Sequence, residues 1–276
     1  MRPFVSINMA MSADGKIATA NRELCSFGSS ADSAFLYELR SRADAIMTGA
    51  TTLRAQNADL TSGGNLYQRR RKRRGLAVEP IRVIVSSRGK LSPALRIFRK
   101  KGGPLILLTT EQIRPRDQAK MEQAGASLGR FGSHRLDLPA ALHWLTRKWG
   151  VRHLHCEGGG ELNQSLFETG WVDELYLTIC PRIFGGRQAP GIAEGKGFPS
   201  LSAAFRMELR TVRKIGDEIF LKFIRKRSQS YTRSSTAKSE TGTVQKPKVV
   251  SSRRKRYPSR PKSRARNTDP SVSVIS

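Results

Sequence analysis

Along the first 224 residues, short apolar or alternating runs are separated by stretches in which apolar residues recur at helical spacing. The short runs predict strands at residues 4–9, 44–47, 81–85, 104–108, 151–156 and 174–179. The helical spacing predicts helices at residues 30–42, from Pro139 through Trp149, and after residue 160. A last pair of strands is predicted at 205–211 and 218–224, around a turn that contains Gly216.

This alternation of strands and helices predicts an α/β fold. Parallel strands need long crossover connections, which helices supply, and the helices then cover both faces of the sheet. We therefore expect a largely parallel central sheet with helices on both faces and an antiparallel C-terminal strand pair. Ligands of such sheets bind at the carboxyl ends of the strands.

Three consecutive glycines, Gly158, Gly159 and Gly160, stand between the strand at 151–156 and the helix that follows. Glycines at such a junction let backbone N–H groups approach a phosphate, and the first helical turn adds unpaired donors. The spacing is neither the G-x-G-x-x-G of a Rossmann unit nor a P-loop. The motif alone is therefore compatible with a pyrophosphate site and equally with a structural turn.

Composition divides the chain of 276 residues into two parts. Residues 225–276 carry 15 Lys and Arg against 2 acidic residues and are rich in Ser and Pro, so a disordered basic tail is predicted there. Residues 1–224 hold the rest of the formal net charge of +28 and are basic too. The run Arg69–Arg74 supplies six of those charges and is predicted to be a solvated loop. The charge favours anionic partners.

The cysteines at 25, 156 and 180 and the four histidines lack metal-ligand spacing, so no metal is expected. His155-Cys156-Glu157 matches the H-x-E of zinc deaminases, but no P-C-x-x-C follows it, so the complete signature is absent from the sequence. The chain begins directly with a predicted strand and has no apolar run long enough to cross a membrane, which predicts a cytoplasmic protein.

Several motifs occur together in a known order and spacing. They are Met11–Ala18, Arg42–Leu53, Pro80–Ser86, Glu157–Asn163 and Val172–Leu175. Over residues 2–224 the chain thereby resembles the reductase domain of riboflavin biosynthesis, which is the C-terminal domain of a bifunctional deaminase–reductase. The resemblance implies a dihydrofolate-reductase-like fold. It also implies reduction by NADPH of the ribosyl group of a pyrimidine ribosylamine 5-phosphate to a ribityl chain.

The resemblance also assigns residues to a site. The cofactor is expected to contact Ala10, Thr52, Ser87, Gly158, Gly159, Gly160, Glu161, Leu162 and Asn163. The substrate is expected to contact Arg40, Leu60 and Glu157. Arg40 also suits the negative end of a helix dipole, and Glu157 also suits a solvated loop. Hydride transfer depends mainly on orientation, so no general acid is assigned. Lys16 and Asp14 are candidates, although Asp14-Gly15 equally predicts a tight turn.

The chain departs from the family pattern at three places. Gln56-Asn57-Ala58 replaces a triplet with an acidic residue, Leu24 replaces a polar residue, and Gly63 replaces an arginine that helps to hold the substrate phosphate. Arg54 or the Arg69–Arg74 run is expected to supply the missing charge.

Three functions stay open on the sequence. The first is reduction of the riboflavin precursor, and the second is reduction of another small substrate by the same fold. The third is nucleic-acid binding through the basic tail, which would be weak and salt-dependent. A homodimer is expected.

Overall fold

The computed structural model describes residues 1–22 and 27–226. The strands are β1 (Phe4–Ser12), β2 (Ala45–Gly49), β3 (Ile81–Val85), β4 (Leu105–Thr109), β5 (Ala126–Arg130), β6 (His153–Cys156), β7 (Val172–Cys180), β8 (Met207–Ile215) and β9 (Glu218–Arg225). The helices are α1 (Ser30–Arg40), α2 (Ala50–Gln56), α3 (Asn65–Arg73), α4 (Arg96–Arg99), α5 (Pro115–Gln123), α6 (Leu138–Trp149) and α7 (Gly160–Glu168). Leu24 and the tail from residue 227 onward, for which disorder was predicted, lie outside the described residues.

The strands form one nine-stranded sheet in the order β5-β4-β3-β2-β6-β1-β7-β9-β8. Neighbours from β5 to β7 are parallel, whereas β9 pairs antiparallel with both β7 and β8. The last two strands turn at Gly216, whose φ is 59°. The predicted parallel sheet with an antiparallel C-terminal pair is therefore confirmed.

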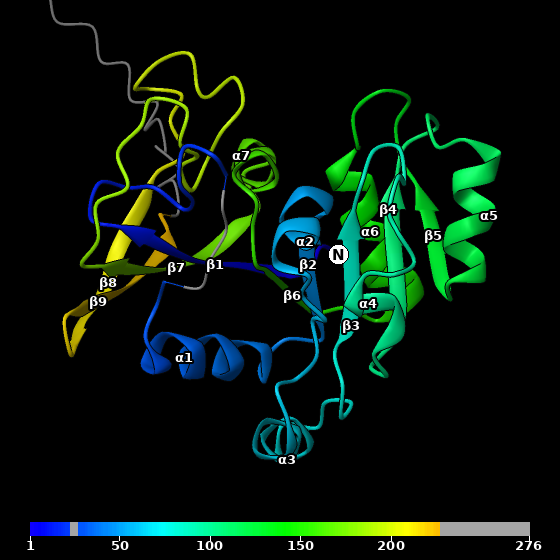
Figure 1. The fold of residues 1–276 in the computed structure, drawn as a ribbon, viewed down its shortest axis with the longest axis horizontal. Helices are drawn as coiled ribbons and strands as arrows, with labels where there is room; N and C mark the ends of the chain where they lie inside the picture. The colour runs from blue at the N-terminus through cyan, green and yellow to red at the C-terminus, as the bar shows by residue number, and fades with distance from the viewer. Residues whose placement is uncertain (23–26, 227–276) are drawn as a thin grey trace, which may run out of the picture. The chain divides into compact units, whose positions relative to one another are not determined.

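Helices cover both faces of the sheet, as predicted. Ala45 and Met47 of β2 point into a cluster with α6 and α7, whereas Ile46 points into a second cluster on the other face. Helix α1 lies on that second face, where Phe35 contacts the rings of Tyr176 and Phe220 at centroid distances of 5.6 Å. Figure 1 shows α1 and α7 on opposite sides of the sheet. The carboxyl ends of the strands are therefore flanked by helices from both faces of the sheet.

The Arg69–Arg74 run was predicted to be a loop, and this prediction is wrong, because it forms most of helix α3. The buried side chain of Arg71 explains why this strongly charged helix packs against the protein. Its Nη1 donates to the carbonyls of Arg40 and Ala43 at 2.7 and 2.6 Å, and its Nε donates to the carbonyl of Ala77 at 2.8 Å. One guanidinium therefore holds the C-terminal end of α1.

The C-terminal boundary of the folded part lies slightly beyond the predicted residue 224. Arg225 is the last residue of β9, and its guanidinium donates to the carbonyl of Gly170 at 2.7 Å and lies 3.3 Å from the Asp173 carboxylate. Arg225 therefore belongs with the sheet rather than with the tail. The further division into a reductase domain and a tail stays a prediction.

Replacement of Arg71 by Ala should lower the free energy of unfolding by about 2–4 kcal/mol, because three hydrogen bonds to backbone carbonyls are lost, two of them buried. Denaturant unfolding measures this change. Arg73→Ala is the matched control on the exposed side of α3 and should stay within about 0.5 kcal/mol of the parent protein. Equal stability of the two variants would contradict the role of Arg71.

Candidate active site

The turn between β6 and α7 requires glycine for two reasons. Gly158 and Gly159 have φ values of 89° and 83°, which are unfavourable for residues with a Cβ. A Cβ on Gly158 would lie 2.4 Å from the sulfur of Met9, and a Cβ on Gly159 would lie 2.8 Å from Oγ1 of Thr52. The glycines thus allow β1, α2 and α7 to meet closely at this point.

The first turn of α7 presents unpaired backbone donors. Asn163 is the first residue of the helix whose N–H reaches an acceptor, the carbonyl of Gly159 at 3.0 Å. The N-cap residue is Gly159, which has no side chain to accept from the N–H groups of Gly160, Glu161 and Leu162. Within the described part of the chain these donors have no partner, so together with the helix dipole they form a site for an anion.

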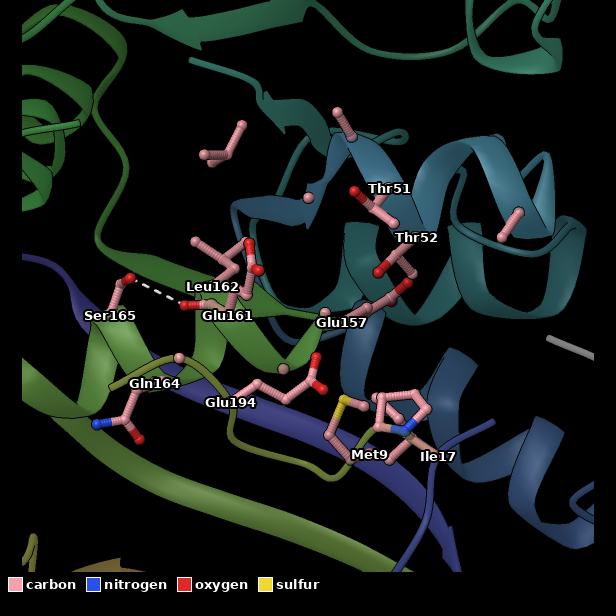
Figure 2. A pocket seen from close by; sticks show the side chains of 18 of the residues that line it. Met9, Ile17, Thr51, Thr52, Glu157, Glu161, Leu162, Gln164, Ser165 and Glu194 are labelled. Carbon is pink, nitrogen blue, oxygen red and sulfur yellow. Dashed lines mark hydrogen bonds between the residues drawn. The ribbon is translucent and has the colours of Figure 1, made fainter. Parts of the chain in front are cut away.

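A pocket of about 1430 Å³ opens at this turn. Nine of the residues assigned from the sequence line it: Ala10, Arg40, Thr52, Ser87, Glu157, Gly159, Gly160, Glu161 and Leu162. Figure 2 shows Thr51 and Thr52 of α2 across from Glu161 and Leu162 of α7, with Glu157 between them. The hydroxyl of Thr52 makes no hydrogen bond to any described residue and is available to a ligand.

Three assigned residues do not line the pocket. Gly158 packs against Met9, as described above. Asn163 is buried, and its Nδ2 donates to the carbonyl of Ile192 at 2.8 Å. Leu60 is buried in the core cluster on the second face, with a φ of 53°. The positions of these three residues favour a role in supporting the site over direct contact with a ligand.

The two candidate catalytic residues, Asp14 and Lys16, also lie outside the pocket. The Asp14 carboxylate accepts from the hydroxyl of Ser12 and from the N–H groups of Phe184 and Gly185, and these contacts lower its pKa to about 2. Lys16 Nζ donates to the carbonyl of Ala189 at 3.2 Å. Both side chains therefore tie the end of β1 to the loop after β7.

Arg40 and Glu157, which were assigned separately to the substrate, form a bidentate ion pair with each other. Nε and Nη2 of Arg40 lie 2.5 and 2.7 Å from the two carboxylate oxygens, and Nη1 donates to the carbonyl of Thr61 at 2.8 Å. The Arg40 side chain is only 6% exposed. Burial opposes its positive charge, but the Glu157 carboxylate more than compensates and raises the pKa of Arg40.

The arginine that the family pattern places at position 63 has no room here. A Cβ on Gly63 would lie 2.1 Å from the ring of Tyr37, and the φ of Gly63 is 90°. The same ring lies 5.2 Å from the Arg40 guanidinium. Of the two expected substitutes for the missing charge, Arg54 lines the pocket and the Arg69–Arg74 run does not.

Sequence reasoning missed several residues that line the pocket. Glu194 is the clearest of these, because its N–H donates to the carbonyl of Gly160 at 3.0 Å and its side chain packs against that glycine. Figure 2 shows its carboxylate beside the glycine turn. Glu194 lies in a long irregular loop without periodicity, so no sequence signal marked it. Asn8 and Asp32 also line the pocket and were not assigned.

The described residues contain no group of three His, Cys, Asp or Glu side chains that could hold a metal ion. In the same part of the chain, no helix combines the length and apolar character that crossing a membrane requires.

The family model for the RibD C-terminal domain matches residues 3–221 of this sequence. The chain belongs to that family. It is 34% identical over 198 residues to a relative from Archaeoglobus fulgidus named 2,5-diamino-6-ribosylamino-4(3H)-pyrimidinone 5′-phosphate reductase. That match covers 72% of this chain and 89% of the relative.

Solved structures of the RibD family have the same fold. A pyrimidine reductase-like protein from Corynebacterium diphtheriae superposes with a TM-score of 0.68 at 22% identity, over 82% of this chain and 92% of that one. RibD from Acinetobacter baumannii superposes with a TM-score of 0.66 at 21% identity, over 82% of this chain but only 58% of the longer RibD chain. These neighbours confirm the predicted dihydrofolate-reductase-like fold.

Replacement of Glu157 by Gln should destabilise the protein by about 3–5 kcal/mol, because the buried Arg40 charge loses its counterion. Thermal or denaturant unfolding measures the loss. Glu168→Gln is the control, because Glu168 pairs with Arg135 at 3.7 Å near the surface and its loss should cost less than about 1 kcal/mol. A stable Glu157→Gln variant would show that the pair does not support the fold.

Proposed function

We propose that this chain is an NADPH-dependent reductase of riboflavin biosynthesis. Its substrate would be 2,5-diamino-6-ribosylamino-4(3H)-pyrimidinone 5′-phosphate, which the name of the Archaeoglobus relative gives for that protein. The ribosyl group would become a ribityl chain. The observation that carries the proposal is the glycine turn, whose unpaired N–H donors open into the large pocket.

The pocket is large enough for two ligands at once. Single small-molecule sites usually have volumes of about 300–1,000 Å³, and this pocket exceeds that range at about 1430 Å³. A dinucleotide pyrophosphate suits the first turn of α7, where backbone donors and the helix dipole favour negative charge. The remainder, between β1, α1 and Glu157, is then left for the pyrimidine substrate.

A bound reduced nicotinamide would supply a hydride to C1′ of the ribosyl group, while the bond from C1′ to the ring oxygen breaks and that oxygen takes up a proton, so that C1′ becomes a methylene. The residues of this chain would hold and orient the two ligands, and such positioning can account for a large part of a rate enhancement. The Thr52 hydroxyl and the donors of Gly160, Glu161 and Leu162 would hold the cofactor. Glu157, fixed by Arg40, keeps lone pairs that suit ribose hydroxyls or pyrimidine N–H groups.

Preference for NADPH over NADH would arise near Ser86 and Ser87, which line the pocket after β3. Arg54 lines the pocket too, and its contacts with Lys90 and Thr51 are long, at 3.3 and 3.4 Å. A 2′-phosphate would gain charge-assisted hydrogen bonds from such groups, each worth about 1.5–3 kcal/mol.

The purified protein should oxidise NADPH in the presence of the diamino pyrimidine substrate and release the ribitylamino product. Gly159→Val should abolish NADPH binding in a fluorescence titration, because the new side chain would collide with Thr52 and strain the turn. Gly197→Val is the control, because Gly197 also has a positive φ of 66° but lies outside the pocket and has open space around it. Unchanged NADPH affinity in Gly159→Val would refute the cofactor site.

The same assay separates this function from reduction of another small substrate, which the departures at Gln56 and Gly63 leave open. Turnover of an unrelated carbonyl compound, without turnover of the pyrimidine, would favour the second function. Homodimer formation and cytoplasmic location stay predictions.

The basic tail is proposed to add weak attraction to polyanions without contributing to reduction. A chain ending at Lys226 keeps β9 intact and should retain the full reductase rate. The full-length protein should retain RNA on a filter at low salt and release it as salt rises, because screening shortens to about 8 Å near physiological ionic strength. Equal RNA retention by the full-length and the truncated protein would assign the attraction to α3. Loss of the reductase rate on truncation would show that the tail contributes to catalysis.

A further inference from the structure

The wall of the pocket formed by α1 carries a carboxyl group without a positively charged partner. Asp32, Leu36 and Arg40 recur every four residues on one face of α1, and all three line the pocket. Arg40 is occupied by Glu157, and Leu36 is apolar. Asp32 makes no ion pair with any described residue, and its Oδ1 is buried without a hydrogen-bond partner.

A structural role would normally explain an aspartate at this position. Ser29 is the N-cap of α1, and Asp32 is three residues later, which is the spacing of a capping box. In that motif the later carboxylate accepts from the N–H of the cap residue. Here Glu218 of β9 takes this role instead, because its carboxylate accepts from the N–H of Ser29 at 2.7 Å and from its hydroxyl at 2.6 Å. Asp32 is therefore free of the usual capping function.

Strand β1 carries a second polar side chain that lines the same pocket and has an atom without a hydrogen-bond partner. Asn8 of β1 is 7% exposed, lines the pocket, and has a buried Oδ1 with no hydrogen-bond partner in the described residues. Thr178 of β7 pairs with Ala10, two residues beyond the partner of Asn8, and its buried hydroxyl is close enough to Asp32 to lower the pKa of that carboxyl. Buried polar atoms without partners are rare in native proteins, and those on this wall are available to a ligand.

The electrostatics of this wall define the kind of ligand group that fits. Burial raises the pKa of Asp32, the Thr178 hydroxyl opposes the rise, and the nearby Glu218 carboxylate adds to it. Glu218 also accepts a hydrogen bond from the thiol of Cys180 at 3.5 Å, which brings no positive charge to this wall. A phosphate would be repelled here, whereas a group with N–H donors would stabilise the carboxylate. Of the two ends of a pyrimidine ribosylamine phosphate, only the pyrimidine carries such donors.

We propose that Asp32 binds the edge of the pyrimidine that carries N3–H and the 2-amino group, and thereby selects the 2-amino substrate over its 2-oxo counterpart. The two adjacent donors of a 2-amino-4-oxopyrimidine match the two oxygens of a carboxylate. In 5-amino-6-(5-phosphoribosylamino)uracil the 2-amino group is replaced by a carbonyl, which would face the carboxylate with a second acceptor. This inference rests on the proposed reductase function and assigns its specificity.

The test compares kcat/KM for the 2-amino and the 2-oxo substrates at about pH 8, where an ordinary carboxyl is ionised. The parent protein should prefer the 2-amino substrate, and Asp32→Asn should reduce that preference by about tenfold or more, because an amide can turn its N–H donors toward the carbonyl. Asp117→Asn is the matched control. It makes the same change in the first turn of α5, outside the pocket, and should keep the parent ratio.

Binding of the two free bases, 2,5,6-triaminopyrimidin-4-one and 5,6-diaminouracil, gives a calorimetric readout that does not require turnover. Asp32→Asn should narrow the difference in affinity between them. An unchanged substrate ratio in Asp32→Asn would overturn the inference, and if that unchanged ratio came with an equal loss of kcat/KM on both substrates, Asp32 would be assigned to the reacting carbon instead. Absence of reduction of either substrate by the parent protein would instead refute the proposed function.

Discussion

The buried ion pair between Arg40 and Glu157 is the interaction on which the pocket depends. It joins the last turn of α1, on one face of the sheet, to the residue that begins the glycine turn at the end of β6. Removing two charges from water is costly, and a pair repays this cost only with good geometry and further hydrogen bonds. The bidentate contact and the bond from Arg40 to Thr61 meet both conditions. Arg71 stabilises the same end of α1, because its guanidinium donates a hydrogen bond to the carbonyl of Arg40.

The order of the strands explains why this pair lies at a binding site. Strand β6 lies between β1 and β2 in the middle of the sheet, so its carboxyl end is flanked by the carboxyl ends of both neighbours. Helix α2 follows β2 directly and brings Thr52 to the glycine turn, while β1 brings Met9. Two segments distant in sequence therefore approach one backbone turn closely, and only glycine permits that approach.

Much of the fold was predictable from the sequence, because buried strands such as Ile81–Val85 are apolar runs with clear ends. Helix α3 was not, since its charged sequence gives no amphipathic signal and its packing depends on the single buried side chain of Arg71. In the site, three consecutive glycines between a strand and a helix predicted a close backbone turn, but the glycines alone did not distinguish a ligand site from a structural turn. The partnership of Arg40 with Glu157 was not, because 117 residues separate them and each has a plausible role by itself. Asp32 was hidden by its capping-box position, which Glu218 fills in the folded chain.

The charges of the pocket differ from the charge of the chain. The sequence carries a formal net charge of +28, yet the carboxylates that line the pocket, Asp32, Asp137, Glu157, Glu161, Glu168 and Glu194, are more numerous than the cations, Arg22, Arg40, Arg54, Arg135 and Lys196. The positive field outside the pocket can raise the local concentration of anionic ligands and speed their approach.

Once the ligands are inside, the pocket itself offers no excess of positive charge. Phosphate groups must then be held by the directed backbone donors of α7 and by a few placed cations, whereas the carboxylates remain for hydroxyl and N–H groups. This division favours ligands that carry phosphates at one end and hydrogen-bond donors at the other, and disfavours polyanions that are charged throughout.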